Sequence, residues 1–73
     1  MKVNKKQGLL YIFNLLKDQQ PIKKQNIMEL LEIEEHSFWR YLQEIRAFIS
    51  NFYLPYELVY KRSTGEYLLI STK

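Results

Sequence analysis

Apolar residues recur over the first two thirds of the chain at the three- and four-residue spacing that is typical of amphipathic helices. The first helix is predicted at about residues 5–18, and its apolar stripe consists of Leu9, Ile12, Phe13 and Leu16, widened by Leu10 and Leu15. Pro21 limits this helix, because the residue before a proline is pushed out of helical geometry. Gly8 should cost the helix about 1 kcal/mol relative to alanine, so its first turn is expected to fray.

Two further helices follow, joined by a tight turn at residues 31–34. The second helix is predicted at about residues 24–31 and should bury Ile27, Leu30 and Leu31. The third is predicted at about residues 35–51, and its buried stripe should consist of Phe38, Leu42, Ile45, Ile49 and Phe52, with Tyr41 and Phe48 beside it. Ile33 is expected to fill the space between the two helices. Glu34 and Glu35 lie where a helix N-terminus favours negative charge, which is worth roughly 0.3–1 kcal/mol when exposed.

The last third of the chain has the alternating pattern of strands. Strands are predicted at about residues 56–61 and 66–71, joined by a turn in which Gly65 supplies a positive φ. A lone hairpin is marginal in water, so it should pack on the helices, and Ile22 should lie in a short extended piece that can pair with it. The predicted class is α+β: a winged helix-turn-helix, in which three helices precede a two-stranded antiparallel wing, in a single domain over residues 1–73.

Composition excludes several classes of protein. Seventy-three residues make one domain near the lower limit for independent folding, and 47% apolar residues are too many for a disordered chain. Without cysteine there is no disulfide framework and no thiolate zinc site, which fits a reducing cytoplasm. No apolar run approaches the roughly 18 residues of a membrane span. With one histidine, no glycine-rich phosphate loop and no suitably spaced acid pair, we expect neither an enzyme nor a cofactor.

The net charge of +3 is modest, so the distribution of charge matters more than its sum. The acids concentrate in one block, formed by Glu29, Glu32, Glu34 and Glu35. The bases occur elsewhere: at the start of the chain, before the second helix, on the third helix and in the hairpin. Folding can bring several of these bases onto one face.

In this order, the motifs of the chain resemble the N-terminal winged-helix domain of DeoR-type and WYL-domain bacterial transcription regulators. The resemblance covers nearly the whole chain: a leucine-rich helix GLLYIFNLL, a second segment IKKQNIMELL, a turn and recognition helix LEIEEHSFWRYLQEI, and a wing YELVYKRSTGEYLL. It implies a cytoplasmic, nucleoid-associated regulator that binds double-stranded DNA through residues 35–51 in the major groove. It does not extend to the family's effector-sensing domain.

Several residues depart from the family pattern. Lys23 stands where a helix-capping serine or threonine is usual, and Glu34 replaces the second cap. Tyr41 replaces the acid that follows the arginine, whereas Arg40 keeps the arginine itself, and Phe38 and Trp39 are bulkier than usual. The preferred base sequence therefore cannot be carried over.

The polar face of the third helix holds the first group of candidate DNA contacts: His36, Ser37, Trp39, Arg40 and Gln43. His36 and Ser37 lie in the first turn, where recognition helices meet base edges. Arg40 is the strongest candidate, because it can bind guanine bidentately or clamp a phosphate, although it can instead pair with Glu44. Trp39 has three possible roles: a contact to sugar or thymine methyl, a partner surface, or a cover for the wing.

The second group of candidates is basic and lies outside the third helix. Lys61 and Arg62, at the tip of the hairpin, are suited to a minor groove or to phosphates. Lys23 and Lys24, at the start of the second helix, are expected to face the DNA backbone, and the amides there can also bind a phosphate.

Two hypotheses for function remain open from the sequence. The first is DNA binding, either as a homodimer on a two-half-site operator or as part of a larger regulator, because one domain has a small footprint. The alternative is a winged-helix module for protein–protein interaction that uses the Trp39 surface without binding DNA. The acidic block and the small net charge favour this alternative.

Overall fold

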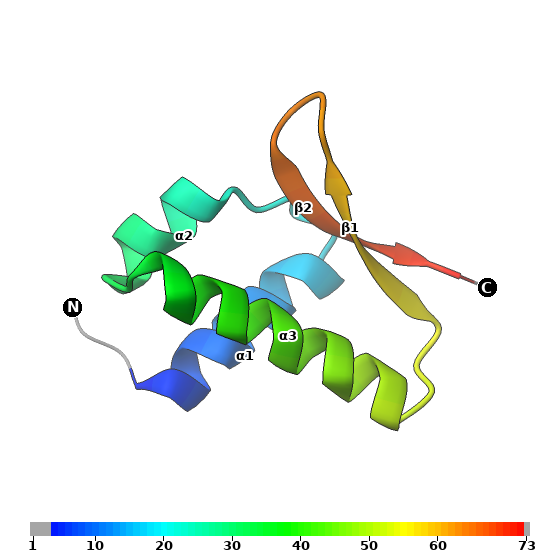
Figure 1. Cartoon of the computed structure of the whole chain (residues 1–73). Coiled ribbons are helices and arrows are strands. Elements are labelled where there is room, and N and C mark those ends of the chain that lie inside the picture. Colours follow the sequence, from blue (N-terminus) through cyan, green and yellow to red (C-terminus); the bar gives the residue numbers. More distant parts are fainter. Residues whose placement is uncertain (1–3, 73) are drawn as a thin grey trace.

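The computed structural model describes residues 4–72 and has an α+β architecture, in which three helices precede a two-stranded antiparallel sheet (Figure 1). The elements are α1 (Lys5–Lys17), α2 (Lys24–Leu31), α3 (Glu35–Asn51), β1 (Tyr56–Lys61) and β2 (Glu66–Ser71). The predicted class α+β is confirmed, and the predicted bounds of the helices and strands agree with the structure to within one residue.

α1 is anchored at its start by two features that its sequence pattern did not suggest. The Asn4 side chain accepts a hydrogen bond of 2.8 Å from the Gln7 amide and so caps the helix. Gly8 is buried, and a Cβ atom added there would lie 3.1 Å from the Tyr41 hydroxyl of α3. The glycine that weakens the helix therefore also permits a close approach of α1 to α3.

The core lies between α1, α3 and the inner face of the hairpin. The largest fully buried side chains are Phe38, Ile12, Leu16 and Leu42. Ile27 and Leu31 of α2, and Leu58, Tyr67 and Leu69 of the sheet, complete the core from the other side. Ile33, in the turn between α2 and α3, packs against this core while partly buried, as the sequence predicted.

Four residues predicted on the buried stripes, or beside them, prove to be exposed: Leu10, Leu30, Phe48, which is 43% exposed, and Phe52. Leu30 is 55% exposed, because α2 has only two turns and directs Ile27, Met28 and Leu31 toward the core instead. Phe52 is 65% exposed, since it follows the last turn of α3, where the chain leaves the helix through a positive φ at Tyr53. Leu10 is 67% exposed on the outer side of α1, which no element in residues 4–72 covers.

The hairpin pairs Tyr56 with Ser71 and Lys61 with Glu66 at its two ends. Gly65 has a φ of 71° in the connecting turn, as predicted. Tyr67 exchanges two backbone hydrogen bonds with Ile22, of 2.9 and 2.7 Å, so the predicted extended piece before α2 does pair with the sheet. This bridge fixes the start of α2 beside β2.

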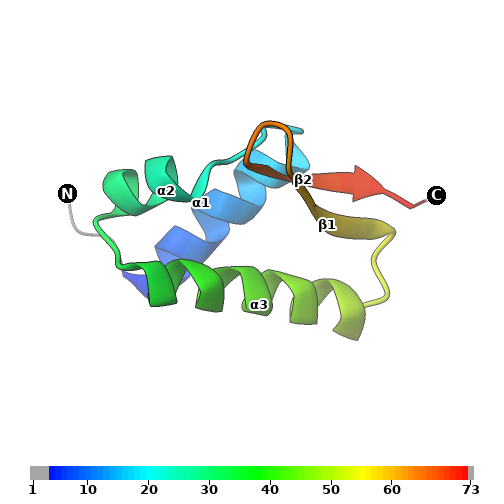
Figure 2. The ribbon, with the colours of Figure 1, turned by 45° about the horizontal axis from the view of Figure 1, so that its top comes forward.

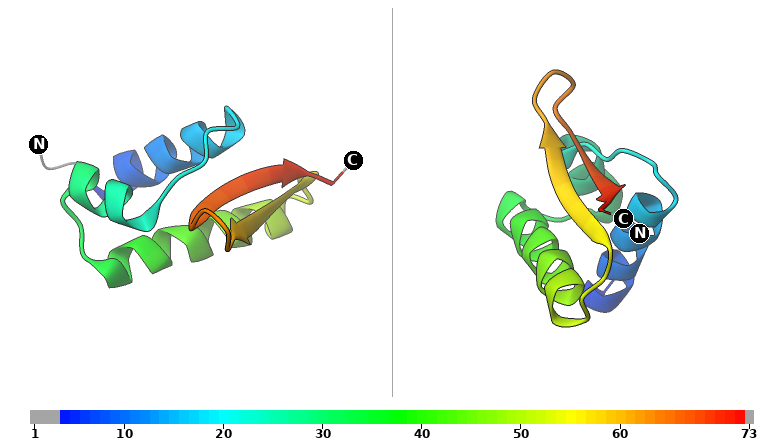
Figure 3. Two further views of the ribbon diagram at one scale, coloured as in Figure 1. Left: turned by 90° about the horizontal axis from the view of Figure 1, so that it is seen from above. Right: turned by 90° about the vertical axis from the view of Figure 1, so that its right-hand side faces the viewer.

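The hairpin and α3 leave two prominent surfaces. Figures 1 and 3 show that the turn of the hairpin projects beyond the helices. Figure 2 shows α3 running along one side of the molecule, with α1, α2 and the sheet all on its other side. One side of α3 is therefore uncovered along the length of the helix.

Candidate nucleic-acid interface

The uncovered side of α3 presents most of the polar residues that the sequence singled out. His36, Arg40 and Gln43 are all exposed. At about 100° per residue they fall within an arc of roughly 60°, opposite the buried Phe38 and Ile45. Tertiary packing thus leaves these three side chains together on one face.

Arg40 is not neutralised by an acid of its own helix. Within residues 4–72, no ion pair joins Arg40 to Glu44, which was the alternative considered from the sequence. His36 lies near an acid, since its Nδ1 is 3.4 Å from Glu34 Oε2, but this contact is an ion pair only when the imidazole is protonated. The guanidinium is consequently available to a partner outside the molecule.

Ser37 lies at the border of this face. It is half-buried, and its amide donates a 3.1 Å hydrogen bond to the Glu34 carbonyl in the first turn of α3. Its position on the helix places it on the side of Arg40 that is closer to α1. Ser37 is therefore less accessible than the other polar residues of α3.

Trp39 packs on the hairpin. Its ring meets Tyr67 of β2 edge-on at a centroid distance of 5.9 Å and Phe38 at 5.3 Å, and the side chain remains 40% exposed. Its indole Nε1 donates a long hydrogen bond of 3.4 Å to Glu35 Oε2. Of the three roles considered for Trp39, the contact with the wing strands is present within the protein itself.

Lys24 is paired with the same carboxylate at the surface. Its Nζ lies 2.6 Å from Glu35 Oε2 and 5.6 Å from the centroid of the Trp39 ring. The hydrogen bond with Glu35 raises the pKa of Lys24, and the hydrogen bond with Lys24 lowers the pKa of Glu35. Sequence reasoning missed this contact, because eleven positions separate the two residues and no local pattern links them.

A pocket of about 460 Å³ joins the start of α2 to α3 and the hairpin. It is lined by Lys23, Lys24 and Gln25 before and within α2, by Trp39 of α3, and by Tyr60, Gly65 and Tyr67 of the hairpin. Lys23 is exposed and makes no side-chain cap, so the first amides of α2 lack a side-chain acceptor there. Tyr60 and Tyr67 are cross-strand partners in the hairpin, so the alternating pattern of the two strands could have placed these tyrosines together.

Two further basic residues lie at the hairpin turn. Lys61 ends β1, Arg62 begins the turn, and both are exposed. The structure therefore gathers the predicted residues into three neighbouring groups: the α3 face, the start of α2 with its pocket, and the tip of the hairpin (Figure 1).

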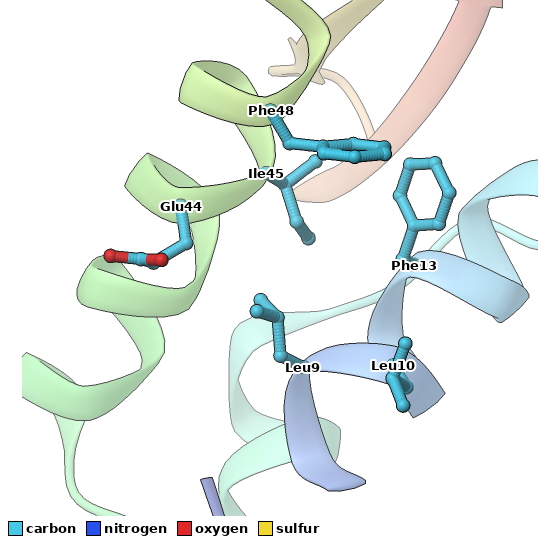
Figure 4. Close-up of a pocket in the computed structure, with 6 residues that line it drawn as sticks. All are labelled: Leu9, Leu10, Phe13, Glu44, Ile45 and Phe48. Atoms are coloured by element: carbon cyan, nitrogen blue, oxygen red, sulfur yellow. The ribbon is translucent and has the colours of Figure 1, made fainter. Parts of the chain in front are cut away.

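An apolar groove of about 320 Å³ lies on the other side of α3, against α1. Figure 4 shows Leu9 and Phe13 of α1 on one side of the groove and Ile45 and Phe48 of α3 on the other, with the Glu44 carboxylate at the rim; the exposed Leu10 also contributes to the lining. The Phe13 and Phe48 rings meet edge-on at 5.5 Å and form one end of the groove. The sequence pattern did not predict this groove, because that pattern assigned the apolar residues of its lining to the core.

Metal-ion and membrane sites were also sought in the part of the chain that the structure describes. Residues 4–72 contain no group of three or more histidine, aspartate or glutamate side chains placed to hold a metal ion. Each helix in these residues is too short or too polar to cross a lipid bilayer.

Comparisons of the chain with known protein families, with curated proteins and with solved structures found no match.

Proposed function

We propose that the chain is a winged helix-turn-helix module that binds double-stranded DNA in a sequence-specific manner and regulates transcription. The observation that carries this proposal is the exposed face of α3, where His36, Arg40 and Gln43 lie together and Arg40 is free of acidic partners in residues 4–72. A major groove about 12 Å wide admits an α-helix, and an arginine on such a face can bind guanine bidentately. The resemblance noted in the sequence implies a bacterial cytoplasm and its nucleoid as the setting.

The remaining basic residues fit contacts to the DNA backbone. Lys61 and Arg62 project at the hairpin turn, where a wing reaches an adjacent groove, and Lys23 precedes the first amides of α2. If about five phosphates are neutralised, the logarithm of the association constant should fall with the logarithm of salt concentration at a slope of roughly −4 to −5. The phosphate contacts would position the module, and α3 would read the bases.

Selection of binding sites from random duplexes tests the proposal directly. A recovered consensus, whose binding weakens with salt at the expected slope, would support it. Failure to enrich any duplex, or binding that is insensitive to salt, would refute it.

The groove between α1 and α3 is the surface that we assign to a second copy of the chain on a two-half-site operator. A two-fold interface must be complementary to itself, and this groove is lined mainly by apolar side chains, with the Glu44 carboxylate at its rim (Figure 4). Leu10, which is 67% exposed, would enter the groove of the other copy. His36, Arg40 and Gln43 do not line the groove, so a second copy there would leave them open to DNA.

Sizing of the complex with the selected duplex tests this assignment. Leu10→Lys should convert a complex of two protomers into a complex of one, whereas Tyr11→Lys, at the next position of α1 and outside the groove lining, should not. If the two variants form complexes with the same number of protomers, the groove is not the dimer interface.

Contact with another protein through the Trp39 surface is the second candidate function. The observation in its favour is that Trp39 remains 40% exposed beside the acid Glu35. It predicts that no duplex is enriched and that Trp39→Ala abolishes association with a protein partner. Partner association that survives this substitution would exclude the Trp39 surface.

A further inference from the structure

Two hydrogen-bond donors converge on one carboxylate oxygen between α2 and α3. Glu35 Oε2 accepts from Lys24 Nζ at 2.6 Å and from Trp39 Nε1 at 3.4 Å. Lys24 Nζ also lies 5.6 Å from the centre of the Trp39 ring, so ring and ammonium are held together. These two donors border the pocket that Lys23 and the hairpin tyrosines complete.

This pair of donors is suited to an anionic oxygen in general. An ammonium and an indole N–H both donate, and a phosphate oxygen accepts in the same way as a carboxylate oxygen. The Lys24 and Glu35 side chains are 37% and 55% exposed, so solvent screens their attraction and an external anion can reach the site. Lys23, which carries no side-chain cap, adds positive charge at its entrance.

We propose that Glu35 is an internal competitor for a DNA backbone phosphate: its carboxylate occupies the site formed by Lys24 Nζ and Trp39 Nε1 in the free protein, and a phosphate displaces it in the complex. This inference rests on the proposed function, because the phosphate belongs to the duplex that α3 reads. It assigns Lys24 a contact that forms only when Glu35 is displaced, in place of the open contact expected from the sequence.

The consequence is a residue that weakens DNA binding without touching a base. Every duplex that contacts this site must displace Glu35 and then tolerate its negative charge nearby. A duplex that also engages the face of α3 gains contacts that offset this cost, whereas a duplex held only by phosphate contacts does not. Glu35 therefore lowers the affinity for every duplex, so that only the stronger binders stay bound, and it acts through Lys24 as a positioning residue.

The test compares Glu35→Gln with Glu34→Gln on a duplex of arbitrary sequence over a series of salt concentrations. Both substitutions remove one negative charge at the start of α3, but the Glu34 carboxylate lies near His36 and, within residues 4–72, makes no ion pair with Lys24. Glu35→Gln should tighten binding several-fold at low salt, because no carboxylate then competes with the phosphate for Lys24 and Trp39, and this gain should shrink as salt screens the charges. Glu34→Gln should tighten binding less.

The dependence on Lys24 separates this mechanism from a general gain in positive charge. In a Lys24→Met background, the change produced by Glu35→Gln should disappear. A gain that persists there, or equal gains for the two glutamine variants, would overturn the inference.

A measurement without DNA keeps the inference testable if the proposed function fails. Trp39 is the only tryptophan of the chain, so its fluorescence reports on this site. Titration with inorganic pyrophosphate should shift the fluorescence of Glu35→Gln at lower concentrations than that of the wild type or Glu34→Gln. If no variant binds any duplex, the proposed function is refuted, and identical pyrophosphate titrations for the three proteins would refute the anion site itself.

Discussion

The substitution of Arg40 by alanine distinguishes a reader of bases from a general cationic surface. Arg40 is exposed and has no ion pair within residues 4–72, so its removal should change the free energy of unfolding by no more than about 0.5 kcal/mol. A bidentate contact to guanine is worth about 1–3 kcal/mol. Since about 1.4 kcal/mol corresponds to a factor of ten, affinity for the operator should fall by about 5- to 150-fold.

Arg46→Ala is the matched control for this experiment. Arg46 is exposed on the same helix, about two turns nearer to its C-terminus, and its removal changes the net charge equally. Titrations with the operator and with a duplex of unrelated sequence, at the same salt concentration, should show that Arg40→Ala lowers the ratio of the two affinities. Arg46→Ala should change the affinities for the operator and for the unrelated duplex by the same factor, so that their ratio stays constant.

The salt dependence separates two roles for Arg40. Loss of a phosphate contact would reduce the magnitude of the salt slope by about 0.9 and weaken every duplex alike. Loss of a base contact would leave the slope nearly unchanged and relax the preference at one base pair. If Arg40→Ala and Arg46→Ala weaken all duplexes equally and preserve the consensus, the polar face of α3 does not read the sequence.

Three further predictions concern the fold that supports this face. Phe38 is fully buried, so Phe38→Ala should lower the free energy of unfolding by about 3–5 kcal/mol. The total free energy of unfolding for a chain of this length is about 4–11 kcal/mol. A loss below about 1 kcal/mol in urea unfolding would contradict the packing of Phe38. Gly8→Ala raises helix propensity by up to about 1 kcal/mol, but the new Cβ would lie close to the Tyr41 hydroxyl. The free energy of unfolding should therefore rise more when the substitution is made in a Tyr41→Phe background, which lacks that hydroxyl. Equal increases in both backgrounds would show that the Tyr41 hydroxyl does not crowd this position. Burial raises the pKa of Tyr67, so the folded protein retains the phenolic proton where the unfolded chain releases it, and stability should fall as the pH rises above about 10. Urea unfolding at about pH 9 and about pH 11 measures this loss of stability, which should be smaller for Tyr67→Phe than for the wild type. An equal loss for the two proteins would show that Tyr67 does not cause it.

The sequence by itself determined the kind of each element and its bounds. Three helices and two strands occur where the periodicity predicts them, and the bridge of Ile22 to the hairpin was also expected. These features follow from short-range geometry, since the spacing of apolar residues along a helix or a strand is set by the backbone. The polar face of α3 could be predicted for the same reason, because it lies opposite the buried Phe38 and Ile45.

Only the tertiary structure decided which apolar residues are covered and which charges meet. Leu10, Leu30 and Phe52 have the pattern of core residues, yet no element of residues 4–72 packs over them, and periodicity does not encode where neighbouring elements end. The contact of Lys24 with Glu35 depends on how α2 crosses α3, a long-range arrangement set by the burial of the whole core. From the sequence, Lys24 was therefore expected to be free to contact a phosphate. In the structure, the packing of α2 against α3 pairs Lys24 with the Glu35 carboxylate.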